Sequence, residues 1–567
     1  MSQAPLRQAL VEWLRSASVE HVFGNPGSSE VPLLDSLVDV DRPTYVLVAH
    51  EAAAISAADA FAQLSGRPGV VSVHVTPGVA NILGGIFLAR SHRSPVVVIA
   101  GQQDSRILGH RPFLASDLVE TVRQHVKWAF QAERAADVLP ALRHAFEVAS
   151  QAPRGPAFVA VPRDLYDHHV ALLEPPSALA ARLGVPGDAA LEEAAAIIAS
   201  ATMPILLSGN AVGACGAAAI DGVIALAETI GAGVYSEHNA TNMHFPSSHP
   251  QYLGGNAHGT AVVRQWLRPA DVLIAVGCDL FMEERFHPEP LVPPGCRIVQ
   301  LDEDPQEIGR LFPVAAGLPG DLPATLRALT SRVRVALRPR EAAVAARREA
   351  VCAQRAALDA ERERERRAVW DRRPIRMPRV YAELRTAMPD DAVMIDEAVN
   401  MASYLHDFFD FRVPGTLLSS KQSWLGWGIG ASLGAQLARP DRRVVAVLGD
   451  GSATYGIQAL WTAARYHLPI VTVILNNGGY MAVQHHLRAY GARAAAAGRY
   501  PGTELSGIDF VSLARGFGVF AERVDDPDAI GPALRSALAS GAPRVVEIAI
   551  DPNDAGFRRA PIPRPAS

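Results

Sequence analysis

Two polar residues that each follow an apolar, β-branched segment form the strongest candidate site in the sequence. Asp450 follows residues 443–449 and Asn477 follows residues 470–476, so the two lie 27 positions apart. A right-handed βαβ unit of that length makes its strands neighbours or near-neighbours and brings both side chains to the same sheet edge. A carboxylate, an amide oxygen and a nearby backbone carbonyl, most simply that of Gly479, would supply hard oxygen ligands to Mg²⁺.

The residues around Asp450 suit the binding of a diphosphate. Gly449 and Gly451 have no Cβ, so phosphate oxygens could approach the backbone closely. Ser452 opens the next predicted helix, whose N-terminus favours anions. Taken singly, a GDG or an NNG segment is more often a plain turn than a site. Their joint occurrence at this spacing predicts a site for a divalent metal and a diphosphate.

The GDG segment and the later pair of asparagines resemble the signature of thiamine diphosphate-dependent enzymes. Within that family the pattern is closest to the benzoylformate decarboxylases, and the likeness covers nearly the whole chain. It is carried by FGNPGS at 23–28, AGQQ at 100–103, the segment 449–470 and NNGGY at 476–480. The resemblance implies thiamine diphosphate and Mg²⁺ as cofactors, with Ca²⁺ able to replace Mg²⁺ in crystals. It also implies cofactor contacts from Asn25, Pro26, Gly27, Asn81, Asn400, Leu425, Gly449, Gly451, Ser452 and Tyr480.

Glu51 is the candidate for the acid that thiamine chemistry needs. It follows a predicted strand at 44–49 and starts a helix in apolar surroundings. A carboxyl group against N1′ of the aminopyrimidine favours the imino tautomer that deprotonates the thiazolium carbon. Desolvation raises a carboxyl pKa toward working pH, which suits this proton sharing. The alternative is a helix-start glutamate that complements the helix dipole.

The turn at 25–28 leads into a helix that contains Pro32. Proline lacks an N–H and belongs in the first helical turn, so Ser29 is the expected N-cap of a helix that starts at Glu30. Ser28 then lies at the exit of the turn, and the resemblance implies that it faces the substrate carboxylate. The resemblance also implies that His74, after the predicted strand at 69–73, moves protons to and from the substrate; alternatively, it bonds to backbone at a strand end.

The sequence departs from the family pattern at the substrate side. The second catalytic histidine of the family follows a strand of the central segment, where ungapped alignment places Glu284, with His287 three residues later. Either His287 serves in a shifted loop, or a carboxylate replaces the imidazole. Ser419 and His486 stand where large apolar rings are expected, so the predicted pocket is more polar.

The elements that position these residues indicate an α/β fold with three doubly wound parallel sheets. Predicted strands alternate with Ala- and Leu-rich helices in each of three segments. The resemblance names them the pyrimidine-binding domain (1–175), the central Rossmann-like domain (188–330) and the diphosphate- and Mg²⁺-binding domain (376–555), with a charged helical linker at 331–375. The glycines at 209–216 do not form the dinucleotide fingerprint, so FAD is not expected.

Composition excludes several classes of partner. The 567 residues carry a net charge of only −5, and the Arg-rich stretch at 332–373 is interleaved with Glu and Ala as in a solvated helix, so nucleic acid is not expected. No apolar run reaches the ~20 residues of a membrane span. The four isolated cysteines and the amphipathic N-terminus favour a cytoplasmic location.

These observations predict an enzyme that converts a 2-oxo acid, similar to benzoylformate, into an aldehyde and CO₂ without oxidation. A carboligase or carbon–carbon lyase with the same cofactor, similar to acetolactate synthase or 2-hydroxyacyl-CoA lyase, is the alternative. A catalytically silent binding protein would have lost Glu51, Asp450 or Asn477, and all three are present. The resemblance implies a homodimer at least, with a homotetramer expected.

Overall fold

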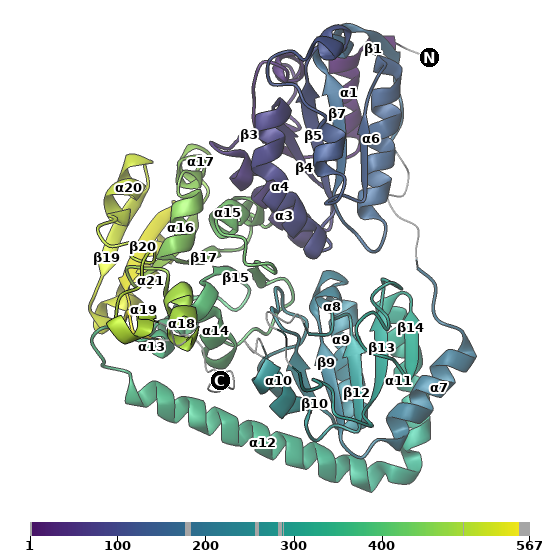
Figure 1. The fold of residues 1–567 in the computed structure, drawn as a ribbon, viewed down its shortest axis with the longest axis vertical. Helices are drawn as coiled ribbons and strands as arrows, with labels where there is room; N and C mark the ends of the chain where they lie inside the picture. Colours follow the sequence, from purple (N-terminus) through teal and green to yellow (C-terminus); the bar gives the residue numbers. More distant parts are fainter. Residues whose placement is uncertain are drawn as a thin grey trace.

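The computed structural model describes residues 3–175, 183–255, 260–281, 286, 288–490 and 493–554. It contains three six-stranded sheets in which all strands are parallel, plus one antiparallel pair, β1 (Gln3–Pro5) with β8 (His169–Ala171). Helices cover the sheets, and the three units are set apart in Figure 1. This confirms the predicted fold class; the domain boundaries themselves stay a prediction.

The N-terminal domain has the strand order β3-β2-β4-β5-β7-β6. Its strands are β2 (His21–Asn25), β3 (Thr44–Leu47), β4 (Gly69–Val73), β5 (Val96–Gln102), β6 (Trp128–Gln131) and β7 (Ala157–Pro162). Its helices are α1 (Leu6–Ser16), α2 (Val31–Ser36), α3 (Glu51–Ser65), α4 (Val75–Ser91), α5 (Leu118–Val122) and α6 (Ala135–Ser150). The central strands β4 and β5 are buried throughout, as expected for a sheet covered on both faces.

The central domain has the strand order β11-β10-β9-β12-β13-β14. The strands are β9 (Pro204–Ser208), β10 (Gly233–Ser236), β11 (Tyr252–Gly254), β12 (Val272–Val276), β13 (Arg297–Asp302) and β14 (Ala316–Pro319). The helices are α7 (Asp188–Ser200), α8 (Asn210–Ala214), α9 (Ala217–Ile230), α10 (Thr260–Leu267) and α11 (Leu322–Leu337). The glycine-rich stretch at 209–216 forms α8 and the turn that leads into α9.

A single long helix, α12 (Glu341–Ala368), joins the central and C-terminal domains along one edge of the molecule (Figure 1). Residues 332–337 of the predicted charged stretch belong to α11 instead. The helix α12 is mostly exposed and carries ion pairs such as Arg367 with Glu363, as in a solvated helix. Two of its arginines are buried instead. Arg355 donates to the backbone oxygens of Ser247 and Tyr252 at 2.6 and 2.9 Å and so anchors the helix to the central domain.

The C-terminal domain has the strand order β16-β15-β17-β18-β20-β19. The strands are β15 (Val393–Glu397), β16 (Leu417–Ser419), β17 (Val444–Gly449), β18 (Ile470–Asn476), β19 (Phe520–Val524) and β20 (Arg544–Ala549). The helices are α13 (Met377–Ala387), α14 (Ala402–Phe408), α15 (Trp427–Ala438), α16 (Asp450–Gly456), α17 (Ala459–Arg465), α18 (Met481–Tyr490), α19 (Arg493–Ala497), α20 (Phe510–Gly516) and α21 (Ile530–Ala539). Across the whole chain, the short 3₁₀ turns are η1 (Ser105–His110), η2 (Arg163–Asp167), η3 (Arg338–Arg340), η4 (Val399–Met401) and η5 (Pro527–Ala529).

Two buried helices, α3 and α15, pack against each other and join the N-terminal to the C-terminal domain. Small residues allow this close approach: a Cβ on Gly434 would lie 1.8 Å from the carbonyl oxygen of Ala57. A Cβ on Gly430 would likewise lie 2.7 Å from the carbonyl oxygen of Ala53. Any larger side chain at these glycines would push the two domains apart.

Charged side chains meet where the three domains join. Arg93 of the N-terminal domain pairs with the buried Asp302 of the central domain at 2.6 Å. Lys421 of the C-terminal domain, only 3% exposed, pairs with Asp279 of the central domain at 2.5 Å. Buried charges are tolerated only when paired, so these contacts specify how the domains fit together.

Candidate active site

Asp450 and Asn477 converge at the carboxyl ends of two adjacent strands, as the sequence predicts. β17 and β18 are parallel neighbours, with Gly449 opposite Leu475. The backbone N–H of Gly479 donates to Asp450 Oδ2 at 3.0 Å and also to Asn477 Oδ1 at 3.1 Å. The carboxylate and the amide oxygen therefore lie at one point of the sheet edge.

The electrostatics of this point suit a cation. Asp450 is buried, and burial raises the pKa of its carboxyl group, although it accepts hydrogen bonds from backbone N–H groups. The Gly479 carbonyl accepts a hydrogen bond from Met481 N at 2.9 Å and keeps a second lone pair. Among the described residues, no group of three His, Cys, Asp or Glu side chains forms a metal site, so amide and carbonyl oxygens would have to complete this one.

A cavity of about 230 Å³ opens beside these groups. Predicted site residues that line it are Leu425, Gly449, Asp450, Gly451, Ser452, Asn477, Gly479 and Tyr480. Gly449 lines this cavity without a side chain, and the heavy atom nearest to a Cβ built on it would be Ser452 Oγ at 3.9 Å. The missing Cβ of Gly451 also makes room for the ring of Tyr480, because a Cβ there would lie 2.6 Å from it.

A second cluster surrounds Glu51 in the N-terminal domain. Glu51 is the first residue of α3 and is 8% exposed. Asn81 Nδ2 donates to Glu51 Oε2 at 3.0 Å, and Asn25 Nδ2 lies 3.4 Å from Oε1. The structure thus brings together three predicted site residues from β2, α3 and α4, with both carboxyl oxygens held in place.

His74 belongs to a hydrogen-bonded network that sequence reasoning missed. Its Nδ1 lies 2.7 Å from Ser29 Oγ and 3.0 Å from Glu30 Oε2, and Ser29 Oγ also contacts Glu30 Oε1 at 2.6 Å. The hydrogen bond with buried Glu30 raises the pKa of His74. Gly27 allows the imidazole to pack on the turn, because a Cβ there would lie 2.2 Å from the ring.

The prediction that Ser29 caps α2 is wrong. The helix begins at Val31, its N-cap is Glu30, and no side chain caps it. The hydroxyl of Ser29 donates to Glu30 Oε1 at 2.6 Å instead, and the hydroxyl oxygen lies 2.7 Å from His74 Nδ1. Ser28, the serine predicted to face substrate, is exposed at the turn. The only sequence signal for this network was a second serine and a glutamate directly after the turn.

Comparison with known proteins decides the family. Models of the thiamine pyrophosphate enzymes match the chain three times: the N-terminal TPP binding domain at residues 5–133, the central domain at 191–329 and the C-terminal TPP binding domain at 397–548. The chain belongs to the thiamine pyrophosphate enzymes. This confirms the resemblance stated from the motifs and supports thiamine diphosphate as the cofactor.

Several relatives of this thiamine pyrophosphate enzyme cover nearly the whole chain. Benzoylformate decarboxylase of Pseudomonas aeruginosa is 32% identical over 552 residues, covering 96% of this chain and 98% of the relative. A probable acetolactate synthase large subunit of Methanocaldococcus jannaschii is 29% identical, covering 97% and 92%. The solved structure of a thiamine diphosphate-dependent 4-hydroxybenzoylformate decarboxylase from Rhodococcus jostii RHA1 superimposes with a TM-score of 0.84, at 29% identity over 97% of this chain and 100% of that one.

A buried carboxylate supports the loop that carries Leu425 into the cavity of this thiamine pyrophosphate enzyme. Glu397, at the end of β15, accepts hydrogen bonds from Gly426 N and Gly428 N, each at 2.7 Å. Burial raises the pKa of Glu397 to about 8, and these two N–H donors oppose the rise. Gly426 has φ +88° and would place a Cβ 2.7 Å from Tyr455, so the turn requires glycine.

The structure describes the remaining predicted site residues to different extents. Glu284 and His287, the alternatives for the second proton-transfer group, lie outside the described residues. For Asn400 only the backbone is described, in the 3₁₀ turn η4. Ser419 and His486 are not among the described residues that line the 230 Å³ cavity. Ser419 ends β16 instead, and its N–H donates to Thr241 O at 2.8 Å.

The Glu51 cluster and the cavity are separate sites within one chain. Every described residue that lines the 230 Å³ cavity lies between Ala398 and Ile550, whereas Asn25, Glu51 and Asn81 belong to the N-terminal domain. The structure also contains, within the described residues, no helix that is both long and apolar enough to span a bilayer.

Proposed function

We propose that this thiamine pyrophosphate enzyme decarboxylates a 2-oxo acid without oxidation, releasing CO₂ and an aldehyde, with Mg²⁺ as the metal. The proposal rests on one observation: the Asp450 carboxylate and the Asn477 amide oxygen meet beside a cavity. Gly449, which has no Cβ, lines that cavity. The similarity to benzoylformate decarboxylase over 96% of the chain supports the reaction type.

The residues of the C-terminal domain fit a diphosphate held through a divalent metal. Asp450, Asn477 and the carbonyl of Gly479 would hold the Mg²⁺, which prefers oxygen ligands and keeps phosphate oxygens in its octahedron. Leu425 and Tyr480 line the cavity and would pack on the organic part of the cofactor. Thiamine diphosphate, when bound, supplies the nucleophilic carbon and the electron sink for loss of CO₂.

Glu51 would hold the proton at the pyrimidine nitrogen. Its two oxygens are oriented by Asn81 and Asn25, so the carboxyl group cannot turn away freely. Its buried position at the start of α3 limits competition from water. A carboxyl group in this setting can accept and return one proton during each turnover.

His74 would move protons on the substrate side, supported by Ser29 and Glu30. The hydrogen bond with the Glu30 carboxylate raises the pKa of His74 and stabilises the imidazolium form, which is the form that donates a proton. Exposed Ser28 is available to face a substrate carboxylate, as the resemblance implies. The second proton-transfer group is proposed to be Glu284 or His287.

Because the Glu51 cluster and the metal-side cavity are separate in one chain, we infer that a complete site needs two subunits. The family pattern implies the same, with a homodimer as the minimum and a homotetramer expected. Cytoplasmic location stays a prediction of the sequence.

A carboligase is the second candidate, because acetolactate synthases are nearly as similar as the decarboxylase. The relative from Methanocaldococcus jannaschii is 29% identical over 97% of the chain. The two reactions share the loss of CO₂ and differ in the fate of the remaining carbon unit. A decarboxylase protonates it and releases an aldehyde, whereas a carboligase joins it to an acceptor.

A panel of aromatic and aliphatic 2-oxo acids tests the proposal. The enzyme loaded with Mg²⁺ and thiamine diphosphate is assayed for CO₂ release, and products are analysed with and without an added 2-oxo acid or aldehyde acceptor. Release of a free aldehyde from an aromatic 2-oxo acid alone supports the decarboxylase. CO₂ release that requires an acceptor and yields a longer hydroxyketone or hydroxy acid supports the carboligase and overturns the first proposal.

A further inference from the structure

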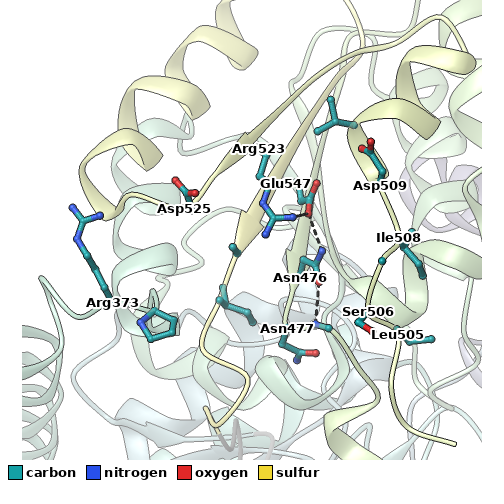
Figure 2. Close-up of a pocket in the computed structure, with 16 residues that line it drawn as sticks. Arg373, Asn476, Asn477, Leu505, Ser506, Ile508, Asp509, Arg523, Asp525 and Glu547 are labelled. Atoms are coloured by element: carbon teal, nitrogen blue, oxygen red, sulfur yellow. Dashed lines mark hydrogen bonds and ion pairs between the residues drawn. The ribbon is translucent and has the colours of Figure 1, made fainter.

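A wide groove borders the loop that carries the proposed metal ligands. Its volume is about 960 Å³, and Asn477 and Ile550 line both this groove and the 230 Å³ cavity. Figure 2 shows the groove with Asn476, Glu547 and Arg523 at its centre. The loop from Asn476 to Gly479 therefore borders both the cavity and this polar network.

The network is built on a buried carboxylate in the middle of a sheet. Glu547 lies on β20, opposite Arg523 of β19 and Ile474 of β18, and is 1% exposed. Its flanking residues on the strand are apolar. Burying a carboxylate in such a strand is costly unless hydrogen-bonding partners compensate, so its presence calls for a reason beyond packing.

Glu547 determines which way the Asn476 amide points. Asn476 Nδ2 donates to Glu547 Oε1 at 2.8 Å, and Arg523 Nη1 donates to the same oxygen at 3.0 Å (Figure 2). An ionised carboxylate only accepts hydrogen bonds, so the NH₂ side of the amide must face Glu547. The oxygen of Asn476 is then directed to the other side, where it accepts from Gly478 N at 3.0 Å.

The hydrogen bond to Gly478 shapes the metal-binding loop. Gly478 has φ +75°, a conformation that turns the chain sharply between Asn477 and Gly479. On the cavity side, Gly479 N donates to Asp450 and Asn477. The turn is thus held at two points, by Asp450 through Gly479 and by the Glu547–Asn476 pair through Gly478.

We propose that Glu547 is a positioning residue for the metal site: through Asn476 it holds the Asn477–Gly479 turn in the conformation that presents the metal ligands. The inference rests on the proposed metal site. Residues that orient metal ligands from outside the coordination sphere typically affect metal affinity by about 10- to 100-fold. A glutamine at position 547 could present its own NH₂ group to Asn476 and release the amide to rotate.

The test measures Mg²⁺ affinity directly in the full-length protein. Mg²⁺ is titrated calorimetrically into apoprotein at saturating thiamine diphosphate. The proteins compared are wild type, Glu547→Gln, Asn476→Ala, the double variant of these two, and Asp450→Asn. Glu522→Gln is the matched control, because this carboxylate lies on β19 opposite Val546 and so faces the other side of the sheet. Thermal unfolding of each apoprotein reports separately on stability.

Each single variant is expected to raise the Mg²⁺ dissociation constant about tenfold or more, and Glu522→Gln to leave it unchanged. The double variant is expected to have an Mg²⁺ dissociation constant no larger than the larger of the two single-variant constants, because both changes act through one turn. An unchanged dissociation constant in Glu547→Gln overturns the inference, even if its melting temperature falls. If that variant does not fold, an unchanged constant in Asn476→Ala overturns it.

The same experiment separates this inference from the proposed metal site. If wild type and Asp450→Asn show the same Mg²⁺ binding, the metal site is wrong and the inference fails with it. If Asp450→Asn loses Mg²⁺ while Glu547→Gln binds like wild type, the metal site stands and only the positioning role fails.

Discussion

The Asp450 carboxylate and the Asn477 amide, from two different strand ends, accept hydrogen bonds from one N–H group, that of Gly479. The two oxygens are therefore held on the same side of the turn. An isolated strand-end turn needs only one such acceptor. Two oxygen acceptors held together beside a cavity are the arrangement that a cation site requires.

Asp450→Asn is predicted to weaken Mg²⁺-dependent binding of thiamine diphosphate more than about tenfold, because Mg²⁺ prefers a charged carboxylate to an amide. The measurement is calorimetric titration of the cofactor at fixed Mg²⁺. Asp509→Asn, an exposed N-cap on α20 in the same domain, is the control and is expected to bind like wild type. Equal affinities for Asp450→Asn and wild type would contradict the assignment.

Glu51→Gln is predicted to lower kcat by about 10²- to 10⁴-fold while the enzyme still binds Mg²⁺ and thiamine diphosphate. The amide keeps the shape of the side chain but cannot exchange the proton. It also turns an NH₂ group toward the donor of Asn25 or Asn81. Steady-state rates of CO₂ release and cofactor titration check this. Full activity in the variant would show that another group handles the pyrimidine proton.

Glu30→Gln is predicted to lower the pKa of His74, because the hydrogen bond that the Glu30 carboxylate accepts from the imidazole is the largest cause of its raised value. Loss of activity on deprotonation of His74 should then begin at lower pH, and the rate at neutral pH should fall several-fold. The pH dependence of kcat/KM and NMR titration of the imidazole measure the shift. An unmoved pH profile would separate Glu30 from the chemistry.

The His74–Glu30 pair also predicts how the stability of the folded protein changes with pH. A histidine whose pKa is raised in the folded protein adds to the free energy of unfolding below its unfolded value of about 6.5. That contribution disappears as pH rises through the raised folded value. Wild type should therefore lose stability relative to Glu30→Gln across this window, as measured by denaturant unfolding at a series of pH values.

Arg93→Ala is predicted to destabilise the protein by about 3–5 kcal/mol, because it leaves the buried Asp302 carboxylate without its partner. The pair of the exposed Arg106 with Asp104 provides the control, and Arg106→Ala should destabilise the protein far less than Arg93→Ala. Denaturant and thermal unfolding compare the two variants. Equal effects would show that the domain junction does not depend on this ion pair.

Much of the fold could be predicted from local patterns. The buried strands consist largely of β-branched residues, and the structure contains every strand that is predicted from such segments. The strands that patterns did not reveal are short, of three to five residues, such as β11 and β16, and carry too little sequence to show a periodicity. The strand neighbours β17 and β18 followed from the length of one crossover alone.

The sequence by itself determined the family and the residues at the carboxyl ends of β17 and β18, because motif spacing and the handedness of βαβ units are local properties of the chain. Only the tertiary structure showed that Ser29 and Glu30 meet His74, that Glu547 orients Asn476, and that Arg93 and Lys421 join three domains. These contacts join residues that are 44 positions apart in the Glu30–His74 pair, 71 in the Asn476–Glu547 pair and 209 in the Arg93–Asp302 pair. No local pattern encodes such pairs, because burial and direction of a polar side chain are set by what the rest of the chain packs against it.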